Sequence, residues 1–238
     1  MHEPQANLIT AHAGAGDTPP NSREFLRYAT QSYADIIEID VSRREDGHLI
    51  AAHSSTTERA EELTSFCQFL ASLPSRQYLN FDLKAPGLEK KTVEILWSTG
   101  LAQRSMYSGT VDYKLWQPLP LSVALRLPEV MLNAENCGLV ALIAEREKSP
   151  QQRLIFWQKN MAKLQEIKLR TGIDKLNLAF PTVDNFVRNY LAEHGLGLSV
   201  WTVDESQAIS EFWQMGVFNL TTNKVTEAAR LRREIHGF

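Results

Sequence analysis

The sequence predicts an α/β fold, a (β/α)8 TIM barrel in which residues 1–238 form a single domain. Short apolar segments alternate with helical stretches along most of the chain, which is typical of parallel β/α construction. The length of 238 residues is close to the roughly 250 residues of such barrels. The 43% hydrophobic content is enough for one large core.

The first strand is expected at Leu8–His12 and the second at Asp35–Ser42. A turn at Asp46-Gly47 leads into a short strand, His48–His53, which we expect outside the ring of eight. The six remaining barrel strands are predicted at Tyr78–Lys84, Ser105–Thr110, Leu121–Leu127, Lys175–Phe180, Leu198–Val203 and Val217–Thr222. These six and the first two make up the barrel.

Helices are expected between the strands. Asn21, with Glu24 three residues later, resembles a capping box that opens a helix reaching about Tyr33. The clearest helix is Gln151–Arg170, where apolar residues recur at helical spacing. These are Leu154, Trp157, Met161, Leu164 and Ile167. The pattern is weakest between Pro128 and Pro150.

Composition and charge exclude several classes of protein. The 25 basic and 28 acidic residues give a formal net charge of -3 without long runs of either sign, so we expect no nucleic-acid partner. We expect no membrane span, because no stretch approaches the roughly 20 apolar residues required. The polar start, Met1 to Asn7, lacks a secretory pattern, and two cysteines, Cys67 and Cys137, indicate free thiols. We therefore predict a cytoplasmic protein. The sequence makes no prediction of its oligomeric state.

Acidic side chains share the inner face of two predicted strands. Side chains alternate along a strand, so Glu38 and Asp40 lie on one face of Asp35–Ser42. On Tyr78–Lys84 the same alternation places Asp82 and Lys84, together with Asn80, on the inner face. Clustered buried carboxylates are costly without a compensating cation, and carboxylate oxygens suit Mg²⁺ or Ca²⁺. The alternative is that arginine or lysine pairs with these acids.

Two histidines stand at strand ends. His12 ends the first strand and His53 ends the short strand, so both are expected at the mouth, where barrel enzymes keep their sites. Flanking the acids, they are candidates for an acid/base pair. A purely structural role for either histidine is the alternative.

Several ordered motifs resemble one family of enzymes. They are His12-Ala13-Gly14, Pro19-Pro20-Asn21-Ser22, the strand from Ala34 to Val41 with Asp46-Gly47 and His53-Ser54 after it, Asp82-Leu83-Lys84, Val200-Trp201-Thr202-Val203, and Gly216-Val217 through Thr222-Asn223. In this order they resemble the glycerophosphodiester phosphodiesterase family, as a short form without its usual insertion. The resemblance implies a barrel of the PLC-like phosphodiesterase type.

The resemblance also implies roles for individual residues. Glu38, Asp40 and Asp82 would hold one divalent cation, Mg²⁺ or Ca²⁺. His12 and His53 would be the catalytic acid/base pair. Lys84 would contact the phosphate of a small-molecule phosphodiester, and Trp201 would pack against its glycerol or alcohol, unless that indole is a core aromatic at the rim.

The sequence departs from the family's motifs at four positions. Ala13 stands where the family has a phosphate-binding arginine, Pro20 replaces a glutamate, Ser54 replaces an aspartate, and Asp82 replaces a longer glutamate. Arg126 could replace the lost arginine, although a surface position is the alternative.

The function implied is a metal-dependent phosphodiester hydrolase that releases an alcohol and glycerol 3-phosphate. The alternatives are the same chemistry on another phosphodiester or a lysophospholipid, and a catalytically impaired barrel that binds a phosphorylated ligand.

Overall fold

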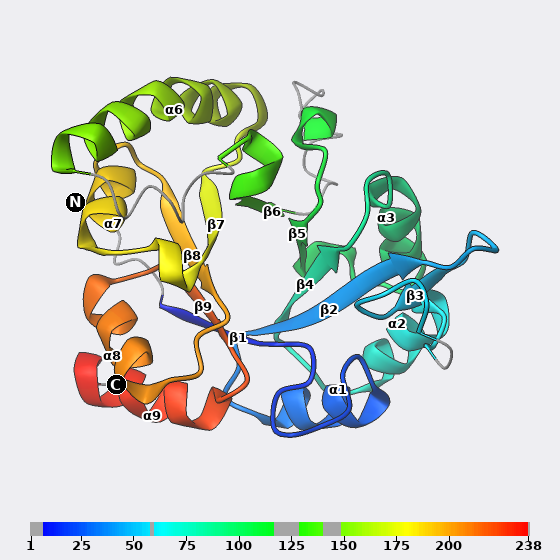
Figure 1. The fold of residues 1–238 in the computed structure, drawn as a ribbon. Coiled ribbons are helices and arrows are strands. Elements are labelled where there is room, and N and C mark those ends of the chain that lie inside the picture. Colours follow the sequence, from blue (N-terminus) through cyan, green and yellow to red (C-terminus); the bar gives the residue numbers. More distant parts are fainter. Residues whose placement is uncertain (1–6, 58–59, 117–128, 140–148, 238) are drawn as a thin grey trace.

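A computed structural model describes residues 7–57, 60–116, 129–139 and 149–237. Eight parallel strands close into a barrel with helices around it (Figure 1), which confirms the predicted fold. The barrel strands are β1 (Leu8–Ala11), β2 (Ile36–Arg43), β4 (Tyr78–Leu83), β5 (Ser105–Gly109), β6 (Glu129–Asn133), β7 (Lys175–Ala179), β8 (Gly197–Trp201) and β9 (Asn219–Thr222). The pairing of β1 with both β2 and β9 closes the ring.

Helices α1 to α3 follow the first half of the barrel, and α6 to α9 follow the second. Their bounds are α1 (Arg23–Gln31), α2 (Leu63–Ser72), α3 (Glu89–Ser98), α6 (Pro150–Thr171), α7 (Asn185–Glu193), α8 (Ser206–Met215) and α9 (Val225–His236). Short 3-10 helices occupy Ala102–Arg104, Tyr113–Trp116, Ala134–Cys137 and Phe180–Thr182. None of the described helices is long and apolar enough to cross a bilayer.

Local signals set the ends of the longest helix. The side chain of Ser149 accepts a hydrogen bond from the backbone of Gln152, whose own side chain reaches back to Ser149, so α6 begins with a capping box. Gly172, with φ of 76°, ends it. The prediction of a helix at Gln151–Arg170 is confirmed.

One predicted strand was placed wrongly. The barrel strand between β5 and β7 is β6, Glu129–Asn133, in the segment where the sequence pattern is weakest. The predicted strand Leu121–Leu127 lies outside the described residues, as does Arg126. Because β6 pairs with both β5 and β7, it fills the fifth place in the ring.

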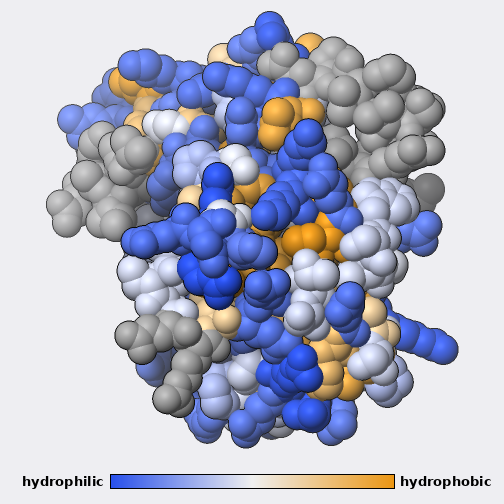
Figure 2. Space-filling view, turned by 90° about the vertical axis from the view of Figure 1, so that its right-hand side faces the viewer, coloured by the Kyte–Doolittle hydropathy of each residue, from blue (hydrophilic) through white to orange (hydrophobic). Residues whose placement is uncertain are grey.

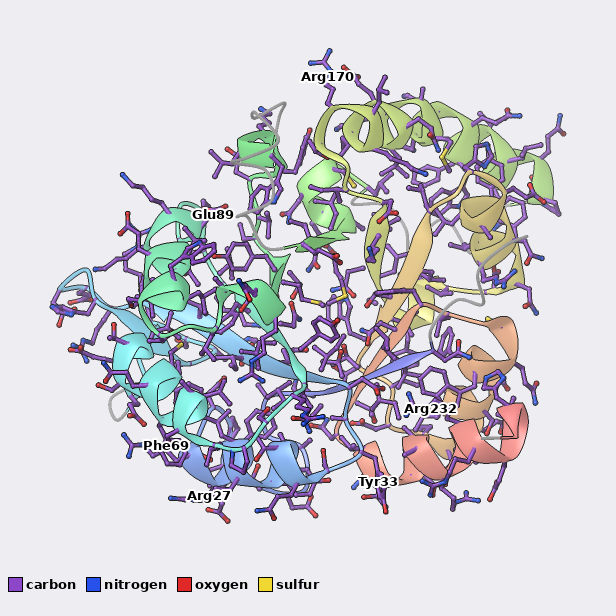
Figure 3. The ribbon with its side chains drawn as sticks, turned by 180° about the vertical axis from the view of Figure 1, so that it is seen from behind. Arg27, Tyr33, Phe69, Glu89, Arg170 and Arg232 are labelled. Atoms are coloured by element: carbon purple, nitrogen blue, oxygen red, sulfur yellow. The ribbon has the colours of Figure 1, made fainter. Side chains whose placement is uncertain are left out.

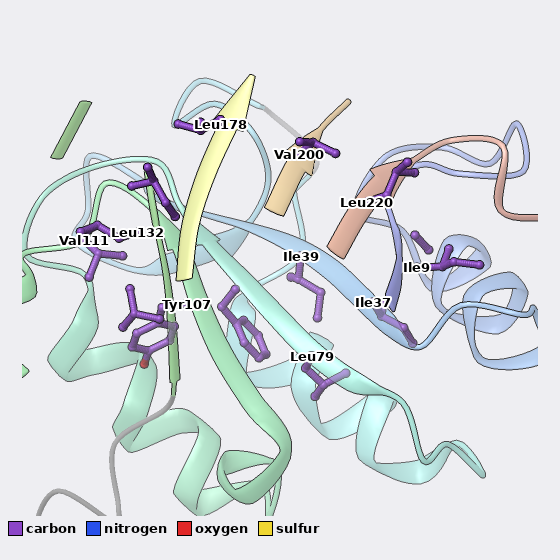
Figure 4. Packing of buried hydrophobic residues seen from close by; sticks show 14 of the residues in the cluster. Ile9, Ile37, Ile39, Leu79, Tyr107, Val111, Leu132, Leu178, Val200 and Leu220 are labelled. Carbon is purple, nitrogen blue, oxygen red and sulfur yellow. The ribbon is translucent and has the colours of Figure 1, made fainter. Parts of the chain in front are cut away.

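The alternating strand pattern sorts side chains between the core and the barrel interior. Outward-facing residues of the strands pack beneath the helices (Figure 4). They include Ile9, Ile37, Ile39, Leu79, Leu132, Leu178, Val200 and Leu220. At one end of the interior Ile36, Met106 and Met131 form a small separate apolar cluster. Ile36 comes two residues before Glu38 and four before Asp40 on β2, so these acids lie nearer the carboxyl end of that strand.

Polar contacts join the outer elements. Arg27 of α1 lies over the ring of Phe69 of α2, with 5.0 Å between the guanidinium and the ring centre (Figure 3). On the other side Arg232 of α9 pairs with Asp35, 2.6 Å away, just before β2. The face shown in Figure 2 is mostly hydrophilic, with hydrophobic residues in separate patches. The first contact joins two neighbouring helices, and the second joins α9 to the segment that leads into β2.

Candidate active site

The site is built at the carboxyl end of the barrel, where β2 and β4 run side by side. The register pairs Glu38 with Asn80 and Asp40 with Asp82, so the inner-facing side chains of the two strands stand next to one another. The ligand atoms of Glu38, Asp40 and Asp82 all lie within 4.8 Å of one another. The prediction that these acids share one end of the barrel is therefore fulfilled in the geometry.

Each of the two aspartates is fixed by neighbours. Asn21 donates to Asp40 Oδ2 at 2.8 Å and accepts from the backbone N–H of Asp40 at 2.9 Å. Ser108 of β5 donates to Asp82 Oδ1 at 2.9 Å. The prediction that Asn21 opens α1 as part of a capping box is wrong, because the N-cap of α1 is Ser22, whose hydroxyl accepts from the Phe25 backbone. Asn21 instead has φ of 51° and orients Asp40.

Lys84 supplies positive charge to the cluster. Its Nζ lies 2.7 Å from Asp40 Oδ1 and also pairs with Asp82. Burial opposes ionisation of this lysine, but the charges of Asp82 and Asp40 outweigh it and raise its pKa. Pairing of the acids with lysine, the alternative considered from the sequence, is thus present. With all three acids ionised, one ammonium would leave two of the carboxylate charges unbalanced.

The surroundings of Glu38 oppose its ionisation. Burial, and then the charges of Asp82 and Asp40, raise its pKa well above the ordinary value, and Lys84 only partly offsets this. No described side chain donates a hydrogen bond to its carboxylate, and its nearest basic partner is His12, with 3.9 Å between Nε2 and Oε1. The atoms of this cluster that could bind a metal are all carboxylate oxygens, the ligand type that Mg²⁺ and Ca²⁺ prefer. The three acids therefore fit a divalent cation.

The two histidines flank the acids from different loops. His12 follows β1 directly, whereas His53 is returned to the mouth by a hairpin in which β3 (Leu49–Ala51) pairs antiparallel with β2. The Nδ1 atom of His53 lies 3.6 Å from Asp40 Oδ2, and its side chain is 76% exposed. Each ring therefore faces a different carboxylate across the cluster.

A cavity of about 360 Å³ opens beside these residues. His12, His53, Glu38, Asp82, Lys84 and Trp201 line it, together with Ser108, Asn133, Glu135, Asn136 and Asn177. Among its described lining residues, Lys84 and the two histidines are the basic ones. Of the residues that depart from the family motifs, Ala13 is buried, while Pro20 and Ser54 are exposed.

Gly109, at the end of β5, makes room for Asp82. Its φ is 78°, and a Cβ atom there would overlap Asp82 Oδ1 and the backbone of Leu83. The absence of a side chain is therefore required for the third acid to occupy its position.

Fold and site together define a (β/α)8 barrel with a carboxylate, lysine and histidine cluster at its mouth. A model of the Glycerophosphoryl diester phosphodiesterase family matches residues 197–226, which span β8, α8, β9 and the start of α9. This match includes Trp201 but none of the acids or the two histidines discussed above. No curated protein matches the sequence.

Solved structures share the fold over nearly the whole chain. A putative glycerophosphoryl diester phosphodiesterase from Agrobacterium tumefaciens is 14% identical, with a TM-score of 0.72, and the match covers 98% of this chain and 100% of that one. A glycerophosphodiester phosphodiesterase from Parabacteroides distasonis is 18% identical, with a TM-score of 0.70 and coverage of 98% and 99%. A phosphodiesterase from Oleispira antarctica, solved with the product sn-glycerol-3-phosphate, is 15% identical, with a TM-score of 0.63 and coverage of 95% and 96%. The resemblance to this family predicted from the sequence is confirmed.

Proposed function

We propose that this chain is a metal-dependent phosphodiester hydrolase that cleaves glycerophosphodiesters to an alcohol and glycerol 3-phosphate. The observation that carries the proposal is the gathering of Glu38, Asp40 and Asp82 within 4.8 Å at the barrel mouth, beside a cavity that both histidines line. The family match at residues 197–226 supports the same chemistry.

One divalent cation, Mg²⁺ or Ca²⁺, would be held by Glu38, Asp40 and Asp82. When bound, it would polarise a nonbridging phosphate oxygen and neutralise charge that develops during hydrolysis. Asn21 already orients Asp40 and Ser108 already orients Asp82, so these two carboxylates themselves need little rearrangement.

The remaining groups bind the phosphate and move protons. Lys84 would turn from the aspartates toward a phosphate oxygen and supply positive charge. His12 and His53 would serve as general base and general acid, because a poor alkoxide leaving group needs a proton and the nucleophile must lose one. Trp201, on the cavity wall, would pack against the glycerol or the alcohol.

The test is hydrolysis of a panel of glycerophosphodiesters, other phosphodiesters and lysophospholipids, with added Mg²⁺ or Ca²⁺ and with chelator. We expect a glycerophosphodiester to be the preferred substrate, chelator to abolish turnover, and His12→Ala to lower kcat by about 10²–10⁴-fold. Turnover that survives chelation would contradict the metal requirement. Measurable cation binding without turnover of any diester would instead favour a barrel that only binds a phosphorylated ligand.

A further inference from the structure

Amide side chains line part of the cavity wall that β6, the turn after it and β7 contribute. They are Asn133, Asn136 and Asn177, and β7 stands opposite β2 in the ring of strands. We propose that this wall binds neighbouring hydroxyl groups on the leaving alcohol, so that the preferred substrate is the glycerophosphodiester of a polyol and not that of choline or ethanolamine. This inference rests on the proposed function and names its substrate class.

The backbone of Gly109 fixes the orientation of two of these amides. Its N–H donates to Asn133 Oδ1 at 3.3 Å, and its carbonyl oxygen accepts from Asn136 Nδ2. A backbone N–H can only donate and a carbonyl oxygen can only accept, so turning either amide round would break its bond to Gly109. The NH₂ group of Asn133 and the carbonyl oxygen of Asn136 are therefore the ends left for a ligand.

Asn177 gives Asn133 a second anchor. The Nδ2 atom of Asn177 donates to Asn133 Oδ1 at 2.9 Å. Asn177 is only 7% exposed, and its own Oδ1 is buried without a hydrogen-bond partner among the described residues. An unpaired buried acceptor is destabilising. The hydrogen bond that the Asn177 side chain does make is the one that orients Asn133.

The free ends of the two amides differ in kind. Within the described part of the chain, neither Asn133 Nδ2 nor Asn136 Oδ1 has a hydrogen-bond partner, and neither atom is fully buried. The wall thus offers one donor and one acceptor, both held by Gly109. Neighbouring hydroxyl groups match this pair, because one hydroxyl oxygen can accept while the other hydroxyl donates. An ammonium group can only donate, and a trimethylammonium group can do neither.

Glu135 adds a carboxylate to the same wall. It belongs to the 3-10 turn that also carries Asn136, and it lines the cavity. Its oxygens can accept from a further hydroxyl. Because Glu135 is exposed, solvent screens its charge, and the carboxylate gives a cationic alcohol little advantage over a neutral one.

The leaving alcohol is the part of the substrate that this wall suits. Glu38 and Asp40 are buried, whereas Asn136 is half-buried and Glu135 is exposed, so the wall lies on the more open side of the cavity. Glycerol is the same in every glycerophosphodiester, while the alcohol varies in size and needs the open side.

The test compares kcat/KM for the glycerophosphodiesters of inositol, choline and ethanolamine in the presence of Mg²⁺. We expect the inositol ester to be preferred over each of the others by about 10–100-fold, the factor that corresponds to leaving one polar group of the wall unpaired. A preference is a ratio measured on one protein sample, so losses of folded protein or of cation affinity cancel from it.

Two variants locate the source of that preference. Asn136→Ala removes the acceptor and should reduce the preference about tenfold. Asn133→Asp keeps the oxygen that Gly109 and Asn177 need and exchanges only the free NH₂ group for an oxygen, so the preference over the ethanolamine ester should fall about tenfold. The control is Asn185→Ala, an exposed residue of α7 outside the cavity, which should leave the preference unchanged.

Equal kcat/KM for the three esters, a preference for choline or ethanolamine, or an equal loss on all three esters in both variants would overturn the inference. Absence of turnover on every diester would contradict the proposed function, and binding would then test the wall. Isothermal titration of His12→Ala with Mg²⁺ should show the inositol ester binding about 10–100-fold more tightly than the choline ester. Equal affinities, or no binding of either ester, would also overturn the inference.

Discussion

Replacing Gly109 with alanine would perturb the site through a single methyl group. The new Cβ would overlap Asp82 Oδ1 and the Leu83 backbone, in a residue whose φ is 78°. The left-handed backbone alone costs a nonglycine residue about 1–2 kcal/mol. The steric overlap adds about 1–3 kcal/mol, because Leu83 belongs to a strand paired on both sides. We expect the free energy of unfolding to fall by about 2–5 kcal/mol.

Gly47 offers a matched control. Its φ is 85°, but a Cβ atom there would meet nothing within 4 Å, so Gly47→Ala should cost only the backbone part, about 1–2 kcal/mol. Urea unfolding of both variants in the presence of chelator measures the difference. Isothermal titration with Mg²⁺ or Ca²⁺ should also show affinity about 10–100-fold weaker in Gly109→Ala, because Asp82 is displaced. If Gly109→Ala proves no more costly than Gly47→Ala and binds cations normally, the packing argument fails.

Three further predictions concern charge. Because the pKa of Glu38 is raised, the metal-free protein keeps a proton on this carboxyl to higher pH than the unfolded chain does. The free energy of unfolding should therefore fall as pH rises through that raised pKa. Cation affinity should rise over the same range, with proton release visible as buffer-dependent binding heats. Buffer-independent heats would count against it. Lys84→Met should lower the free energy of unfolding without metal by about 3 kcal/mol, and saturating Mg²⁺ or Ca²⁺ should restore most of that loss; equal losses with and without metal would contradict a shared cation site. Burial raises the pKa of Cys67 to about 12 and that of Cys137 to about 11, so neither thiol should react with a disulfide reagent until urea unfolds the chain, and rapid labelling of the native protein would disprove their burial.

The alternation of side chains along a strand was sufficient to predict which residues of β2 and β4 face the barrel interior. Each of these strands carries polar residues at every second position, so the sequence alone places Glu38 and Asp40 on one face and Asp82 on its neighbour's inner face. The barrel order then brings the faces together. The same reasoning chose the wrong segment for the fifth strand, since buried parallel strands are apolar on both sides and offer no alternation to select among neighbouring apolar runs.

The partners of the site residues could not be predicted in this way. Asn21 precedes a helix and satisfies the sequence pattern of a cap as well as Ser22 does, but its backbone conformation and its contact with Asp40 depend on how the loop after β1 closes over β2. Asn223 belongs to one of the motifs that resemble the family, but no role was predicted for it from the sequence. Its contact with His12 joins residues 211 positions apart, which barrel closure alone determines.

The most direct test of the cation site is a crystal structure of the protein soaked with Mn²⁺ in place of Mg²⁺ or Ca²⁺. We predict an anomalous peak among Glu38, Asp40 and Asp82, at a distance of about 2.0–2.6 Å from their oxygens, with Lys84 Nζ moved away from the aspartates. A map without that peak, in which Lys84 still bridges Asp40 and Asp82, would contradict the account.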